Sequence, residues 1–115
     1  MALDPHLTDL MRTALKGRRG LREQRMFGGC CWMVDGNMLC GISGSRFLFR
    51  VGKEGMPEAL TRPGAEPMAV GGRKLGGFVW VDADAAIDAG LADWIAVADR
   101  FVATLPPKAP GGATH

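Results

Sequence analysis

Histidine is scarce in this sequence of 115 residues, which has only two. His6 lies near the start of a predicted helix and His115 is the last residue, so neither has a nucleophile beside it in sequence. The segment 41–45 (Gly-Ile-Ser-Gly-Ser) does not match the nucleophile elbow G-x-S-x-G, because position 45 is serine. We therefore expect no catalytic residues, although residues distant in sequence could still converge in the folded chain.

Cysteine is also scarce, with three residues and no disulfide-scaffold spacing. Cys30 and Cys31 are adjacent and would point to opposite faces of a strand, so they cannot ligate one ion together. Cys31 and Cys40 could share an ion, but no third or fourth soft ligand is near in sequence. We expect no metal, free thiols and a reducing, cytoplasmic compartment.

Strong net charge and long apolar runs are both missing. The formal net charge is +2, which by itself predicts no nucleic-acid surface, so direct DNA binding is expected to be weak. No apolar run approaches the length of a membrane span, and the first residues do not resemble a signal peptide. The length fits one domain, expected over residues 1–108, with a disordered tail at 109–115.

A hairpin signal is present at Asp35-Gly36, which lies between two apolar runs. Glycine adopts positive φ without penalty and aspartate tolerates it, so a two-residue turn fits. Val34 would then pair with Asn37, and regular pairing would put Cys31 opposite Cys40. Their Cβ atoms would lie about 4.5–5.5 Å apart.

Alternation along this hairpin predicts two sheet faces. A second turn at Gly44-Ser45 would pair Ile42 with Phe47. The expected core face holds Cys31, Met33, Met38, Cys40, Ile42, Phe47, Phe49 and Val51. The expected second face exposes an interaction surface of Trp32, Leu39, Leu48, Arg46 and Arg50. Such a patch predicts association, either as a homodimer or with another protein, unless the glycine-rich segment 62–77 covers it.

Helical periodicity appears at both ends of the chain. Apolar residues recur at helical spacing over 5–16, in a short stretch at 53–61 and in a long stretch after Asp88 that ends before Pro106. Strands are expected near 26–34, 37–43, 46–51 and 78–81. The order α-β-β-β-α-β-α predicts an α+β, two-layer fold, with a mostly antiparallel sheet and helices on one face.

Basic residues gather in two predicted loops. They are candidate anion contacts, or alternatively solvated links. The glycine-rich loop does not match a Walker A sequence, so no cofactor is expected. These candidates are Arg18, Arg19, Arg22, Arg25, Arg73 and Lys74.

Several segments together resemble the TfoX N-terminal domain family. They are Arg25–Gly29 (RMFGG), Asp35–Gly41 (DGNMLCG), Phe47–Val51 (FLFRV), Pro63–Met68 (PGAEPM) and Leu105–Lys108 (LPPK). The resemblance covers residues 5 to 108. It implies a secretion-chaperone-like two-layer α/β fold.

TfoX (Sxy) proteins are known as regulators of natural competence genes in bacteria, and full-length regulators carry a second, C-terminal domain. The resemblance therefore implies a non-catalytic cytoplasmic regulator that acts through protein–protein contacts, with transcription machinery as a candidate partner. The alternative is a small enzyme or ligand-binding α+β domain of unknown substrate.

Overall fold

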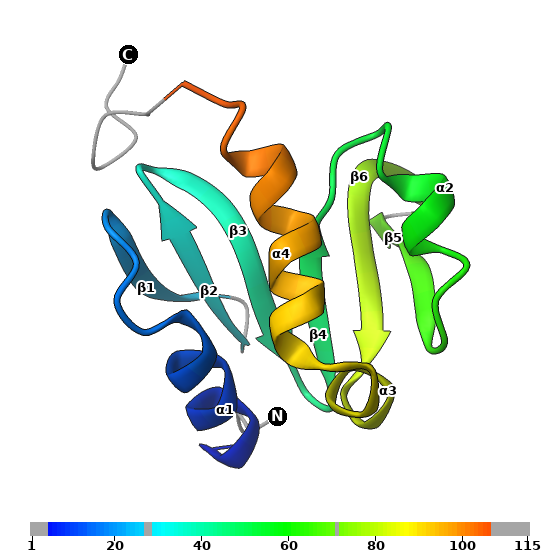
Figure 1. Ribbon diagram of the computed structural model, residues 1–115. Coiled ribbons are helices and arrows are strands. Elements are labelled where there is room, and N and C mark those ends of the chain that lie inside the picture. Colours follow the sequence, from blue (N-terminus) through cyan, green and yellow to red (C-terminus); the bar gives the residue numbers. More distant parts are fainter. Residues whose placement is uncertain (1–4, 27–28, 71, 107–115) are drawn as a thin grey trace.

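A computed structural model describes residues 5–26, 29–70 and 72–106. One six-stranded antiparallel sheet forms a layer, and the helices pack against one of its faces (Figure 1). The elements are α1 (Pro5–Leu15), β1 (Leu21–Met26), β2 (Gly29–Val34), β3 (Asn37–Ser43), β4 (Arg46–Arg50), α2 (Met56–Ala59), β5 (Ala65–Val70), β6 (Arg73–Asp82), α3 (Ala83–Ala89) and α4 (Leu91–Val102). The predicted α+β, two-layer fold class is confirmed.

The sheet has the strand order β1-β2-β3-β4-β6-β5, so β1 and β5 are its two outer strands. Its central strands are joined by tight turns at the two predicted positions. Asp35 and Gly36 adopt φ of 52° and 82°, as a primed two-residue turn requires. Gly44, with φ of 59°, begins the second turn, and Ile42 pairs with Phe47 as predicted.

The pairing of β2 with β3 is irregular at one residue. Met33 pairs with Met38 but Trp32 pairs with Cys40, so Leu39 is an extra residue in β3, a β-bulge. Every residue of β2 before the bulge is therefore shifted by one relative to the prediction. The predicted pairing of Cys31 with Cys40 is wrong, because Cys31 pairs with Gly41 instead.

The bulge also changes which side chains reach the core. A one-residue slip moves a whole strand's side chains to the other face. Trp32 and Leu39 lie under the helices and are 1% and 0% exposed, so their predicted place on an exposed second face is wrong. Cys31, Met33 and Met38 were predicted for the core face, but their pairing places them on the opposite face.

Helices α1 and α4 both bury apolar side chains in the core. In α1 the predicted apolar stripe is buried, with Met11 and Leu15 fully inaccessible. In α4 the ring of Trp94 stacks on Phe49 of β4, with ring centroids 5.2 Å apart. Burial of these large side chains beneath an amphipathic helix is the main stabilising term for such a layer.

The structure contains elements that the predicted order omits. Strand β1 occupies the expected basic link, β5 occupies the expected loop after position 62, and β6 begins before the expected strand. The expected last helix corresponds to α4, and a separate short helix, α3, precedes it and ends at Gly90; Asp82 caps α3 by accepting a hydrogen bond from the Ala85 amide at 3.4 Å. The predicted tail, residues 109–115, lies outside the described residues.

The helices are short. None of those in the described ranges is long and apolar enough to cross a membrane.

Candidate functional site

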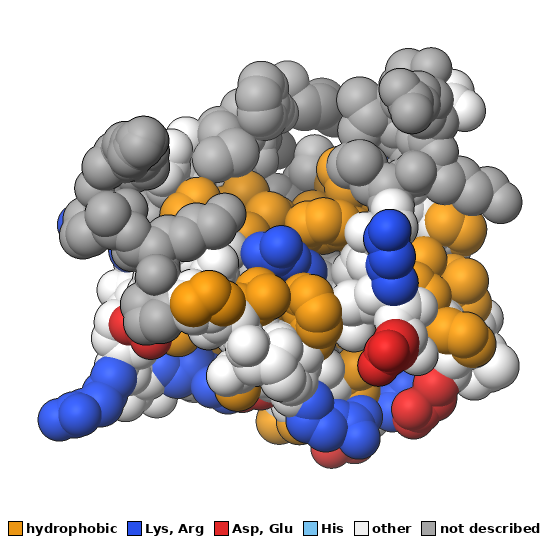
Figure 2. Space-filling view, turned by 90° about the horizontal axis from the view of Figure 1, so that it is seen from above, with side chains coloured by type: hydrophobic (Ala, Val, Ile, Leu, Met, Phe, Trp, Pro, Cys, Tyr) orange, Lys and Arg blue, Asp and Glu red, His pale blue; other side chains and the backbone are white. Residues whose placement is uncertain are grey.

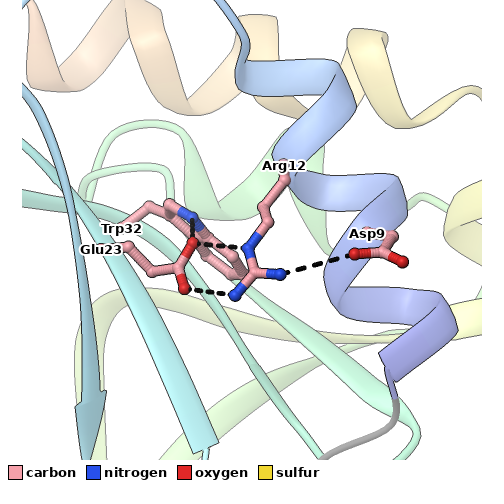
Figure 3. Close-up of polar contacts among 4 residues, drawn as sticks. All are labelled: Asp9, Arg12, Glu23 and Trp32. Carbon is pink, nitrogen blue, oxygen red and sulfur yellow. Dashed lines mark hydrogen bonds and ion pairs between the residues drawn. The ribbon is translucent and has the colours of Figure 1, made fainter.

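A cluster of polar side chains, some exposed and some partly buried, joins α1, β1 and β2 (Figure 3). Glu23 on β1 accepts hydrogen bonds from Arg12 Nε at 2.8 Å and from Arg12 Nη2 at 2.6 Å. The same carboxylate accepts a third bond from Trp32 Nε1 at 3.0 Å. Arg12 also forms an ion pair with Asp9, at 3.4 Å. The cluster fastens α1 to the outer strand of the sheet and satisfies the indole of a buried tryptophan.

The charges and pKa values of this cluster favour a structural role for it over a catalytic one. The hydrogen bond from Arg12 lowers the pKa of Glu23, so its carboxylate is charged and already occupied by donors. Burial raises the pKa of the nearby Cys30 thiol to about 11. A thiol that stays protonated at neutral pH is a poor nucleophile.

The other two cysteines are also unsuited to nucleophilic chemistry. Burial raises the pKa values of both Cys31 and Cys40. Cys40 is fully buried, and its Sγ lies 3.7 Å from Met11 Sδ. All three cysteines are free and buried. Within residues 5–26, 29–70 and 72–106, no group of His, Cys, Asp or Glu side chains is arranged to hold a metal ion.

The second feature is the face of the sheet opposite the helices, which we call the helix-free face. It consists of Cys31, Met33, Met38, Leu48 and Trp80, as the pairing of their strands shows. No helix in the described part of the chain covers it (Figure 1). Its centre is closely packed, with Cys31 8% and Leu48 5% exposed, while the two methionines and Trp80 are half-buried.

A charged side chain is fixed on this face. The guanidinium of Arg46 lies over the ring of Trp80, 4.2 Å from its centroid. It also forms an ion pair with Glu66 of β5 at 3.6 Å. The two contacts orient Arg46 along the sheet surface.

The predicted interaction residues are thus separated by the fold. Leu48 and Arg46 lie on the helix-free face, whereas Trp32 and Leu39 are in the core. Arg50 lies at the end of β4, with its guanidinium 5.5 Å from the ring centroids of both Phe78 and Phe101. Met33 and Met38 were assigned to the core face, because the bulge reverses the assignment of faces, and Trp80 was missed because the pairing of β6 with β4 was not predicted.

The predicted anion contacts do not form one patch. Arg18 is held in an ion pair with Asp99 of α4 at 2.5 Å. Arg22 and Arg25 are exposed on β1 but pair with residues of opposite faces of β2, so they point to opposite sides. Arg19 is exposed in the preceding turn. The side chains of the last two candidates, Arg73 and Lys74, lie outside what the structure describes.

A third feature is an open groove of about 730 Å³ where β4 and α4 end, which we call the α4–β4 groove. Figure 2 looks onto this end of the molecule and shows Lys and Arg side chains set among hydrophobic ones. The site was not predicted from the sequence. The signal that could have indicated it is the presence of glycines in two of the segments that line it, at positions 52 and 55 and at positions 76 and 77. The groove is lined by Arg50, Lys53, Gly77, Phe78, Arg100 and Phe101, among others.

No curated protein and no solved structure matches the chain significantly. The model of one family, the TfoX N-terminal domain, matches residues 13–101. This range contains the central hairpin, all six strands and most of α4. Because the match spans most of the sequence, the chain belongs to the TfoX N-terminal domain family.

Proposed function

We propose that this protein is a non-catalytic regulatory domain that binds a partner protein through the helix-free face. The observation that carries the proposal is the composition of this face. It presents half-buried Met33 and Met38 toward one end and half-buried Trp80 under an oriented Arg46 toward the other. Tryptophan, methionine and arginine are the residue types that protein interfaces favour.

The chemistry of the described side chains supports a binding role over catalysis. The thiols of Cys30, Cys31 and Cys40 have raised pKa values, so none is an activated nucleophile. The carboxylate of Glu23 is fully engaged by Arg12 and Trp32. A general acid or base needs an accessible group whose proton can move, and this cluster does not offer one.

We further propose that the partner belongs to the transcription machinery, as the role of TfoX-type competence regulators implies. Direct binding of duplex DNA would be weak, because Arg18 is neutralised by Asp99 and Arg46 by Glu66. The exposed arginines of β1 are separated from β4 by two strands, or about 14 Å at the usual strand spacing. A second copy of the chain is the alternative occupant of the same face.

The test is affinity capture from the native cell with a matched pair of variants. Met38→Glu places a charge on the helix-free face, whereas Ala96→Glu places one on the exposed side of α4. We expect the wild-type chain and Ala96→Glu to enrich the same protein, and Met38→Glu to lose it while keeping its helical circular dichroism. Sedimentation velocity of the purified chain distinguishes a second copy from a different protein. Equal capture by all three chains would reject the helix-free face as the binding surface.

A further inference from the structure

We propose that the α4–β4 groove binds a small organic anion, a carboxylate or phosphate ester attached to a flat apolar body. The open volume of about 730 Å³ matches sites for small molecules, which measure roughly 300–1,000 Å³. The groove lies at the end of the sheet and is lined by none of the five residues that define the helix-free face, although Arg50 and Phe78 are each two residues along their strands from Leu48 and Trp80 of that face.

Arg50 is the centre of the proposed site. Its guanidinium lies 5.5 Å from the ring centroids of both Phe78 and Phe101, within the range of cation–π attraction. It makes no hydrogen bond or ion pair with any of the described residues. Two aromatic rings therefore hold the group in place while its N–H donors remain available. A guanidinium in this state suits the paired oxygens of a carboxylate or phosphate.

The surrounding charges favour an anion over a cation. Lys53 and Arg100 also line the groove, and neither is in an ion pair with another described residue. Of the two carboxylates at the groove, Glu58 forms an ion pair with Arg62 at 3.5 Å, which leaves only Glu54 without such a partner. Three positive side chains thus face one uncompensated negative one.

The apolar part of the groove is built on glycine. Gly52 has a φ of 79°, and a methyl group there would overlap the ring of Phe101. The amides of Val51 and Gly52 both donate to the carbonyl oxygen of Gly77, at 2.8 and 3.1 Å. This arrangement brings the ring of Phe101 directly against the main chain at Gly52. Val97, on the same helix, also lines the groove. A flat apolar group has matching surface here, next to the positive charge.

The experiment is a titration of the full chain by two-dimensional amide NMR with three probes: phenyl phosphate, benzoate and benzyl alcohol. We expect the anions to shift the amides of Gly52, Gly55 and Gly77, and the neutral alcohol to bind about tenfold more weakly or worse, since it lacks a charge-assisted hydrogen bond. The ratio of the two anion affinities identifies phosphate or carboxylate as the preferred group. Equal binding of benzyl alcohol, or no shift at the groove with either anion, would overturn the proposal.

Three variants locate the contact. Arg50→Gln should weaken phenyl phosphate binding by about tenfold or more, and Lys53→Gln should weaken it by less. The control Arg19→Gln removes an exposed charge that does not line the groove and should bind as wild type does. If Arg50→Gln loses the dispersed spectrum of a folded chain, Lys53→Gln and Arg100→Gln decide the question. Unchanged affinity in the folded groove variants would also overturn the proposal, whereas binding retained in Met38→Glu would separate this site from the helix-free face.

Discussion

Replacement of Glu23 tests whether its main role is to satisfy the buried indole of Trp32. The carboxylate receives two hydrogen bonds from Arg12 and one from Trp32 Nε1. Arg12 is on the surface, with its side chain 47% exposed, whereas Trp32 is 1% exposed. If Glu23 is removed, water can take its place as the hydrogen-bond partner of Arg12, but water has little access to the indole of Trp32.

The magnitude follows from that difference in burial. Glu23→Ala leaves the indole N–H without an acceptor, and an unsatisfied buried donor costs about 1–3 kcal/mol of folding free energy. Glu23→Gln keeps an amide oxygen in the same place, so it should lose much less. Asp9→Ala is the matched control, because it removes only the exposed ion pair with Arg12 and should have no measurable effect.

The assay is urea denaturation followed by tryptophan fluorescence, with the free energy of unfolding extrapolated to water. We expect the midpoint of Glu23→Ala to fall while the dependence on urea stays constant, which indicates a change in stability alone. If Glu23→Gln were as unstable as Glu23→Ala, the ion pair would be the main contribution and the reasoning would be refuted.

The same residue predicts a pH dependence. The hydrogen bond from Arg12 lowers the pKa of Glu23 below its ordinary value of 4.5. The unfolded chain therefore binds this proton more readily, so the contribution of Glu23 is complete above about pH 5 and is lost as the pH falls through the folded pKa. Stability measured from pH 7 to pH 3 should fall less steeply in Glu23→Gln than in the wild type, and parallel curves would contradict this.

Three further predictions concern packing and reactivity. Leu39→Ala should lower the free energy of unfolding by about 2–5 kcal/mol, because Leu39 is fully buried. The control Leu60→Ala, at a site 36% exposed, should change it by about 0.5 kcal/mol or less. Equal effects of the two variants in calorimetry would contradict the bulge that places Leu39 in the core. Gly52→Ala should destabilise more than Gly44→Ala, since both have positive φ but only the first meets an aromatic ring; equal melting temperatures would argue against that contact. At pH 8, iodoacetamide should alkylate Cys30 of the native protein at least about a hundredfold more slowly than a cysteine of the unfolded chain, because the pKa of Cys30 is about 11 rather than 9.0. Fast labelling of native Cys30, measured by mass spectrometry, would refute the burial of this thiol.

The central hairpins show how far local sequence determines the fold. Asp35-Gly36 and Gly44-Ser45 set two turns correctly, because each turn needs backbone angles that few residues adopt. The pairing of Ile42 with Phe47 followed directly from the second turn. The family and the α+β class were also predictable, since they depend on these same segments.

The bulge at Leu39 could not be predicted in the same way. Alternation assumes one residue opposite one residue, and an apolar run such as Met38–Cys40 fits either face. The choice is made by tertiary packing, because burial of Trp32 beneath the helices is possible only after the slip. The groove was missed for a related reason, since Arg50, Lys53 and Arg100 meet only when α4 crosses the sheet.

The two outer strands have a consequence for the behaviour of the protein at high concentration. An exposed strand edge can template the addition of further chains and lead to fibrils. Here β1 presents Arg22, Glu23 and Arg25, whose charges would have to be desolvated, and β5 contains Pro67, which has no N–H to donate to an added strand. Growth along the hydrogen-bonding direction is therefore disfavoured at both ends of the sheet. We therefore expect a reduced tendency toward amyloid-like polymerisation in a chain in which 47% of the residues are hydrophobic.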